Sequence, residues 1–327
     1  MSTTDSSRGK EVKDNLEDKA VIAPAVLGDA PADERRDAKR PAAETRASKA
    51  KKRMSNPLAS LLAVVIAVLW TIPTFSLFLS AFRPETAIKT TGWWTFFANP
   101  EVTVNNFNLV LYGSENFASF FINTIVITLP AVIIPITLAL LASYAFAWID
   151  FPGSDWLFVA VFALQIVPIQ VTLIPLLSDY VNWGLNGSFW PIWLSHSIFA
   201  LPLAIFLLHN FMKDIPRSLI EAARVDGAGH VKIFFMVLLP LLTPAIAAFG
   251  VFQFLWVWND LLVALVFGSD LQTAPLTVRL ANLVGSRGTE WHLLTAGALI
   301  AIIVPMAVFI SLQRFFVRGL LAGGVKG

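Results

Sequence analysis

The sequence predicts an all-α membrane protein with six transmembrane helices and a short cytoplasmic helix between spans 4 and 5. Hydrophobic residues make up 56% of the 327 residues and charged residues 14%, against about 25% charged in a typical soluble domain. Residues 1–56 carry 13 of the 24 Lys and Arg and 10 of the 22 Asp and Glu. Long apolar runs begin only after this charged part. We therefore expect two regions, a polar tail over 1–56 and a membrane domain over 57–327.

The tail is predicted to be disordered and cytoplasmic. It has mixed charge, three prolines and no aromatic residue, so it cannot bury enough apolar surface to offset its chain entropy. A cleavable signal peptide needs an apolar core near the N-terminus, and none precedes Leu58. We expect the tail to be a solvated tether.

Six segments of the second region are long and apolar enough to cross a bilayer, which takes about 20 residues. The predicted spans are residues 58–82, 117–148, 156–177, 189–211, 241–267 and 293–316. They lack the period-two alternation of outer-membrane strands, which favours helices over a barrel. The second is overlong and contains Pro130 and Pro135, which predicts a kink or a tilt.

Basic residues in the short connections give the orientation. The cluster "SKAKKRM" directly precedes the first span, and the connection 212–240 holds four Lys and Arg. Each of the two outer connections that hold Lys or Arg has two. Both termini and the connection 212–240 are therefore predicted to be cytoplasmic.

The stretch "DIPRSLIEAARVDGAG" interrupts the apolar chain within that connection. Pro216 suits the start of a helix, and Gly227 with Gly229 suits its C-terminal end. About ten residues give roughly 15 Å of helix, too short to span the bilayer. We expect this helix to lie along the cytoplasmic face.

Two interpretations of the short helix follow from its residues. Ala222 and Ala223 would allow a partner surface to approach closely, while Glu221, Arg224 and Asp226 offer hydrogen bonds at its edge. The helix is then suited to a cleft of another protein. The alternative is an ordinary connector helix at the membrane interface.

A family resemblance favours the first interpretation. Glu221-Ala222-Ala223, Gly227, Val237 and Leu239-Pro240 resemble the EAA loop, E-A-A-x3-G-x9-I-x-L-P, of membrane subunits of bacterial ABC importers, with Val at the Ile position. "FPG", "WVWNDLLVAL" and "QTAPLTVRL" extend the likeness to carbohydrate-type permeases, similar to the smaller membrane subunit of the maltose transporter.

The resemblance implies a permease subunit of an ATP-driven importer for a maltose-like or other α-glucoside oligosaccharide, in the bacterial plasma (inner) membrane. Its partners would be a second homologous permease subunit, two ATP-binding subunits, an extracytoplasmic sugar-binding protein and membrane lipid, but no nucleic acid. It implies no cofactor in this chain, because ATP and Mg are bound by the partner ATPase. The implied ATPase-coupling residues are Glu221, Ala222, Ala223, Asp226 and Gly227.

The residues themselves predict no enzyme. There is no phosphate-binding G-x4-G-K-[ST], no H-E-x-x-H and no G-x-S-x-G. With no cysteine and no ligand spacing around His196 or His209, we expect no metal site. An ion-coupled secondary transporter remains the alternative, although Asp260 is the one clear acidic candidate in the spans.

Polar groups in the apolar runs are the candidates for a substrate path, because an unpaired polar group is costly there. The set is Asn123, Gln165, Gln170, His196, Gln253, Asn259 and Asp260. We select Gln165, Trp256, Asn259 and Asp260, and the spacing of the last three predicts one shared helical face. Asn259 and Asp260 either line the path or hold neighbouring helices together.

Overall fold

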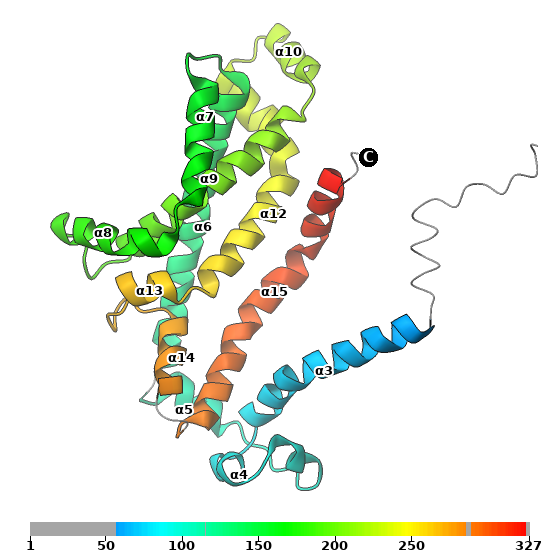
Figure 1. Ribbon diagram of the computed structural model, residues 1–327, viewed down its shortest axis with the longest axis vertical. Helices are drawn as coiled ribbons and strands as arrows, with labels where there is room; N and C mark the ends of the chain where they lie inside the picture. Colours follow the sequence, from blue (N-terminus) through cyan, green and yellow to red (C-terminus); the bar gives the residue numbers. More distant parts are fainter. Residues whose placement is uncertain (1–56, 115, 286–288, 325–327) are drawn as a thin grey trace, which may run out of the picture. The chain divides into compact units, whose positions relative to one another are not determined.

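The computed structural model describes residues 57–114, 116–285 and 289–324. Residues 69–327 form one compact unit, and residues 1–68 belong to another. The predicted disordered tail lies outside the described residues. Within these ranges every regular element is a helix (Figure 1), which confirms the all-α prediction.

The helices follow one another along the chain with short connections. Their bounds are α3 (Pro57–Ala81), α4 (Glu85–Thr90), η1 (Trp93–Phe97), α5 (Asn105–Tyr112), α6 (Phe117–Trp148), α7 (Ser154–Ala163), η2 (Leu164–Ile166), α8 (Ile169–Asn182), α9 (Trp190–Lys213), α10 (Arg217–Val225), α11 (His230–Ile233), η3 (Phe234–Leu238), α12 (Leu239–Trp258), α13 (Leu262–Phe267), α14 (Leu276–Gly285) and α15 (Trp291–Gly324). Five helices are long and apolar enough to span a membrane, and a sixth span exists if one bent pair is counted as a single span.

The predicted third span, 156–177, is not one straight helix. The chain bends by 99° between the segments Ser154–Ile166 and Ile169–Asn182. Val167 and Pro168 form the break with extended ψ angles of 119° and 131°. A residue before proline is pushed out of the helical region, and proline itself has no N–H to donate. The prediction missed this break because it counted only apolar residues.

The predicted fifth span, 241–267, is wrong at both ends. The spanning helix runs from His230 to Trp258 and includes the π-helical turn η3. It stops at Trp258, and α13 begins separately at Leu262. The Asp260 carboxylate accepts the backbone N–H groups of Val263 and Ala264 at 3.4 and 3.0 Å, in the first turn of α13. A side chain that satisfies the free N–H groups of a helix start favours a new helix there.

The core of residues 69–327 lies between α6, α9, α12 and α15. In Figure 1 these helices run side by side, with α6 against α9 and α12, and α12 against α15. Apolar residues of α6, α9, α10, α11, η3 and α12 make one buried cluster, which we call the α10-end core. Its members include Tyr144, Leu208, Met212, Ile220, Ile233, Leu238 and Leu242. The other two clusters lie around α8, α13 and the start of α9, and around α5, α14 and the start of α15.

Prolines inside the spans leave carbonyls without their usual helical partner, because proline cannot donate to the carbonyl four residues earlier. Prolines inside the long helices include Pro73, Pro202 and Pro244 in α3, α9 and α12, Pro130 and Pro135 in α6, and Pro305 in α15. The carbonyls freed by Pro130, Pro135 and Pro305 have side-chain partners. In all three cases a side chain from a neighbouring helix donates to the freed carbonyl. The pairs, at 3.0, 3.1 and 3.1 Å, are Trp193 Nε1 to Val126 O, Gln253 Nε2 to Ala131 O and Trp258 Nε1 to Ala301 O. We call them the proline–carbonyl bonds.

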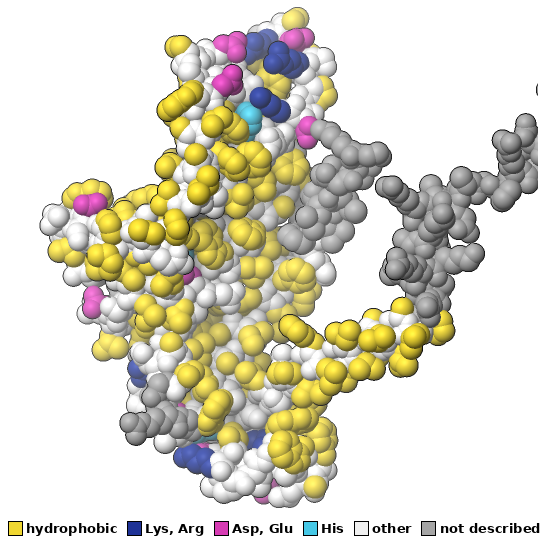
Figure 2. Space-filling view, viewed as in Figure 1, with side chains coloured by type: hydrophobic (Ala, Val, Ile, Leu, Met, Phe, Trp, Pro, Cys, Tyr) yellow, Lys and Arg dark blue, Asp and Glu magenta, His cyan; other side chains and the backbone are white. Residues whose placement is uncertain are grey.

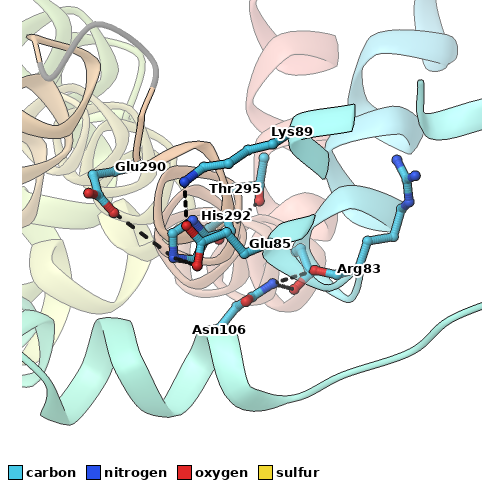
Figure 3. A network of polar contacts seen from close by, with 8 residues as sticks. Arg83, Glu85, Lys89, Asn106, Glu290, His292 and Thr295 are labelled. Atoms are coloured by element: carbon cyan, nitrogen blue, oxygen red, sulfur yellow. Dashed lines mark hydrogen bonds and ion pairs between the residues drawn. The ribbon is translucent and has the colours of Figure 1, made fainter. Parts of the chain in front are cut away.

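At the end of the unit away from α10, polar side chains connect several helices (Figure 3). The buried Asn106 amide donates to the Ala81 and Arg83 carbonyls at 3.1 and 2.8 Å. Nearby, His292 Nε2 lies 3.6 Å from a Glu85 carboxylate oxygen. The pKa of the exposed Glu85 carboxyl is lowered, mainly by a hydrogen bond from Lys89 and secondly by the charge of His292. These contacts tie α3, α4, α5 and α15 together.

We expect Asn106→Ala to destabilise this end. Losing both hydrogen bonds from a buried amide costs about 1–3 kcal/mol, which lowers the melting temperature by about 3–8 °C. The exposed neighbour Asn105 provides the matched control, Asn105→Ala. Thermal unfolding of the purified protein in detergent measures both variants, and equal melting temperatures would contradict the role of Asn106.

Candidate functional site

The predicted cytoplasmic helix is present as α10, over Arg217–Val225. It follows α9 after a short turn, and Pro216 immediately precedes its first residue. Figure 1 places α10 at the end of residues 69–327 that is opposite α5. The Glu221-Ala222-Ala223 part of the motif therefore lies on a short helix separate from the long spans, whereas Val237 and Leu239-Pro240 lie in η3 and at the start of α12.

Gly227 gives this helix its C-terminal cap. Its φ is +77°, in the left-handed region that glycine adopts without a Cβ penalty. The Gly227 N–H donates to the Arg224 carbonyl, and the Ala228 N–H donates to the Ala223 carbonyl, both at 2.9 Å. This pair of bonds is the Schellman arrangement. The glycine at this motif position is thus explained by backbone geometry.

One side of α10 packs on the protein and the other is open. Ile220 is 3% exposed within the α10-end core, and Ala223 and Ala228 pack against that core. Glu221 and Ala222 are exposed. The two motif alanines therefore differ. Ala222 lies on the open side, where its small side chain would allow another protein to approach closely, whereas Ala223 faces the core. Ala223 seats the helix on the spans.

The segment after the cap is anchored to α6. The Tyr144 hydroxyl lies 2.7 Å from His230 Nδ1, and the Tyr144 ring meets Phe234 edge-on with centroids 5.5 Å apart. The chain then passes through η3 directly into α12. A single π turn within an α-helix often occurs at functional sites. The segment between α10 and α12 therefore contacts α6 as well.

Charged side chains of both signs gather around α10, whereas the middle of the molecule shows a mainly apolar face (Figure 2). Such a distribution fits a helix at the water-facing end of a membrane protein. The exposed charged residues on and beside α10 are Lys213, Asp214, Arg217, Glu221, Arg224, Asp226 and Lys232.

Two of the predicted path residues lie together. Gln165 and Trp256 line one pocket of about 510 Å³, along with Gln253, Phe199 and Phe252. A second pocket of about 390 Å³ shares Gln165 and is lined by residues of the α7–α8 break and α9. Pockets of 300–1,000 Å³ with mainly apolar walls and a few polar groups are typical of small-molecule sites. The break at Pro168, which the sequence analysis missed, forms one wall.

The other two predicted path residues lie elsewhere. Because α12 ends at Trp258, Asn259 and Asp260 do not continue one helical face with Trp256, and that prediction is wrong. The exposed Asn259 amide donates to the Leu255 carbonyl of its own helix at 2.7 Å. Besides holding the start of α13, Asp260 lies 3.7 Å from His196 Nε2 and accepts the Thr277 hydroxyl through its backbone oxygen at 2.7 Å. These contacts match the interpretation that Asp260 holds helices together.

Asn123 has a role that the sequence analysis did not assign. Its amide donates to the Gln272 and Ala274 carbonyls, both at 3.0 Å, and fixes the segment before α14 on α6. Among the described residues, no group of three or more His, Cys, Asp or Glu could hold a metal ion.

Comparisons with known proteins match most of the chain to one family. The family model of the binding-protein-dependent transport system inner membrane component matches residues 118–321. The osmoprotective compounds uptake permease protein GgtD of Synechocystis sp. is 53% identical over 268 residues, covering 80% of this chain and 90% of that protein. The alpha-glucoside transport system permease protein AglG of Rhizobium meliloti is 49% identical over 234 residues, covering 70% of this chain and 61% of that protein.

A solved structure shows the same fold. A crystal structure of a bacterial ABC transporter involved in import of the acidic polysaccharide alginate contains a chain with a TM-score of 0.69 and 20% identity, covering 81% of this chain and 98% of that one. Permease subunits of this family are non-catalytic and carry no cofactor, since the partner ATPase binds ATP. The chain belongs to the family of binding-protein-dependent transport system inner membrane components, as a carbohydrate-type ABC transporter permease subunit.

Proposed function

We propose that this chain forms part of the translocation path of an ATP-driven importer for an α-glucoside or a similar small, neutral sugar. The observation that carries the proposal is α10, a capped helix with one side buried in the α10-end core and the other side open. Family membership favours this importer over the ion-coupled alternative.

In this proposal α10 docks into a cleft of an ATPase subunit. Glu221, Ala222 and Asp226 lie on its exposed part, while Ala223 and Gly227 fix its position and its end. Closure of two ATPase subunits would move α10, and the α10-end core would pass the displacement to α6, α9 and α12. To invert a population from 1:99 to 99:1 takes about 5.5 kcal/mol, so the helix must be held firmly.

The proposed substrate rests on the relatives. AglG is a permease protein for alpha-glucosides, and GgtD takes part in the uptake of osmoprotective compounds. In this pocket the exposed Gln165 provides an amide and Trp256 an aromatic ring, which suit sugar hydroxyls and pyranose faces. An osmoprotective compound is the second candidate, because GgtD matches over 90% of its own length.

The proposed complex has a second homologous permease subunit, two ATPase subunits and an extracytoplasmic sugar-binding protein, in a bacterial plasma membrane. Within the unit of residues 69–327, the apolar side chains of Leu69, Trp70 and Phe78 on α3 are 60%, 83% and 46% exposed and so leave a surface for lipid or for that second subunit. Basic residues near α10 support a cytoplasmic position for it and for both termini.

The substrate proposal is tested by uptake of a panel of labelled di- and oligosaccharides and osmoprotective compounds in a strain lacking only this subunit. We expect loss of α-glucoside uptake, which the wild-type gene restores. Uptake should persist when an uncoupler is added while cellular ATP is held constant. Uptake that collapses with the uncoupler, or that is unchanged by the deletion, would contradict the proposal.

The coupling role is tested at the helix cap. Gly227→Ala places a Cβ at a left-handed residue, which costs roughly 1–2 kcal/mol, although there is open space around it. We expect lower uptake per ATP hydrolysed at equal membrane abundance. Gly227→Asn should lose less, because Asn tolerates this conformation.

Gly229→Ala is the matched control for that experiment. Gly229 lies two residues away, also in open space, but its φ is −76°, which any residue adopts. Equal uptake per ATP in Gly227→Ala and Gly229→Ala would show that the cap does not contribute to coupling.

A further inference from the structure

The three proline–carbonyl bonds link the spans in a specific order. Trp193 joins α9 to α6, Gln253 joins α12 to α6, and Trp258 joins α12 to α15. Each acceptor is the carbonyl four residues before a proline. Two of the three donors belong to α12, the helix that continues from α10 through α11 and η3.

The Gln253 bond is buried and the Trp258 bond is partly buried, whereas the Trp193 bond lies at the exposed surface of the helices. Gln253 is 0% and Trp258 3% exposed, and both lie well inside the packed helices. In a membrane no water replaces a lost partner, so a carbonyl freed by proline has to be satisfied by protein. Directional bonds also fix the sliding and rotation of one helix against another, whereas apolar contacts tolerate small shifts.

We infer that Trp193, Gln253 and Trp258 are positioning residues for transport, which hold α6, α9, α12 and α15 in one register so that they move together when α10 is displaced. This inference rests on the proposed coupling function. The prolines provide the acceptors, and the indole and amide groups provide the register. Without these bonds, the α10-end core would move while the far halves of the spans lagged behind.

The pair Gln253 and Pro135 allows a direct test by a double-mutant cycle. Gln253→Leu removes the donor and leaves the Ala131 carbonyl unpaired. Pro135→Ala supplies a backbone N–H four residues after Ala131, so the helix itself can serve that carbonyl. The second change should therefore rescue the first.

Two measurements on the purified, reconstituted complex read the cycle. The first is the melting temperature, which we expect Gln253→Leu to lower by about 2–5 °C. The second is sugar imported per ATP hydrolysed, which we expect to fall about 3- to 10-fold, the factor typical of losing one hydrogen bond. The double variant Gln253→Leu with Pro135→Ala should recover most of both losses.

The cross-pair Gln253→Leu with Pro130→Ala is the matched control. Pro130 lies on the same helix, but the carbonyl that it frees, that of Val126, accepts from Trp193 and not from Gln253. The effects of these two substitutions should therefore be additive. The same logic predicts that Pro130→Ala rescues Trp193→Phe and leaves Gln253→Leu unchanged.

Additive melting temperatures in the matched cycle would overturn the inferred bond. Coupled melting temperatures with unchanged sugar per ATP would show a structural role only, and would overturn the positioning role. If the wild-type complex imports no sugar of the panel, the proposed substrate is wrong, and ATP turnover stimulated by the binding protein replaces sugar per ATP as the second readout.

Discussion

The requirement that buried backbone groups find partners without water shapes this structure more than any other constraint. In lipid each unpaired carbonyl costs several kcal/mol, yet the spans contain prolines that free carbonyls at Val126, Ala131 and Ala301. Side chains of neighbouring helices supply all three partners. Such bonds between membrane helices are worth about 0.6–2 kcal/mol each. Their larger contribution is to fix which turn of one helix faces which turn of the next.

The same requirement explains the ends of the helices. Asp260 satisfies the first N–H groups of α13 where α12 stops, and Gly227 allows the last carbonyls of α10 to be paired. Asn106 does the same for the carbonyls at the end of α3. At each of these helix ends, one polar side chain or one glycine therefore completes the backbone hydrogen bonding.

The sequence predicted the broad architecture because hydrophobicity and length decide which helices can cross a bilayer. The second predicted span agrees with α6 at both ends, and the EAA stretch predicted a helix ending near Gly227. The break at Pro168 was missed because Val167 and Pro168 are apolar and leave the hydropathy of the segment unchanged. The end of α12 was missed because the residues after Asp260 are as apolar as those before Asn259.

The site was predictable only where backbone geometry or one short helix determined it. Gly227 could be assigned to a cap from its place after good helix formers, whereas the different roles of Ala222 and Ala223 depend on which side of α10 meets the core. Gln165 and Trp256 are distant in sequence, and only the bend between α7 and α8 brings them to one pocket. The signal for Trp193, Gln253 and Trp258 was available in principle, since each proline marks a carbonyl that needs a donor. Which side chain donates depends on how the helices pack, and the sequence alone does not give that packing.

In the proposed mechanism, α10 meets an ATPase subunit and carries its motion into the spans. The chain has no cysteine, so single cysteines can be placed on it without further changes. The most direct measurement is site-specific cross-linking of Ala222→Cys to the ATPase subunits, with and without ATP, compared with Asn105→Cys at the opposite end. We expect an ATP-dependent cross-link from Ala222→Cys and none from Asn105→Cys. Cross-linking from Asn105→Cys, or an absence of cross-linking from Ala222→Cys in an assembled and active complex, would contradict this mechanism.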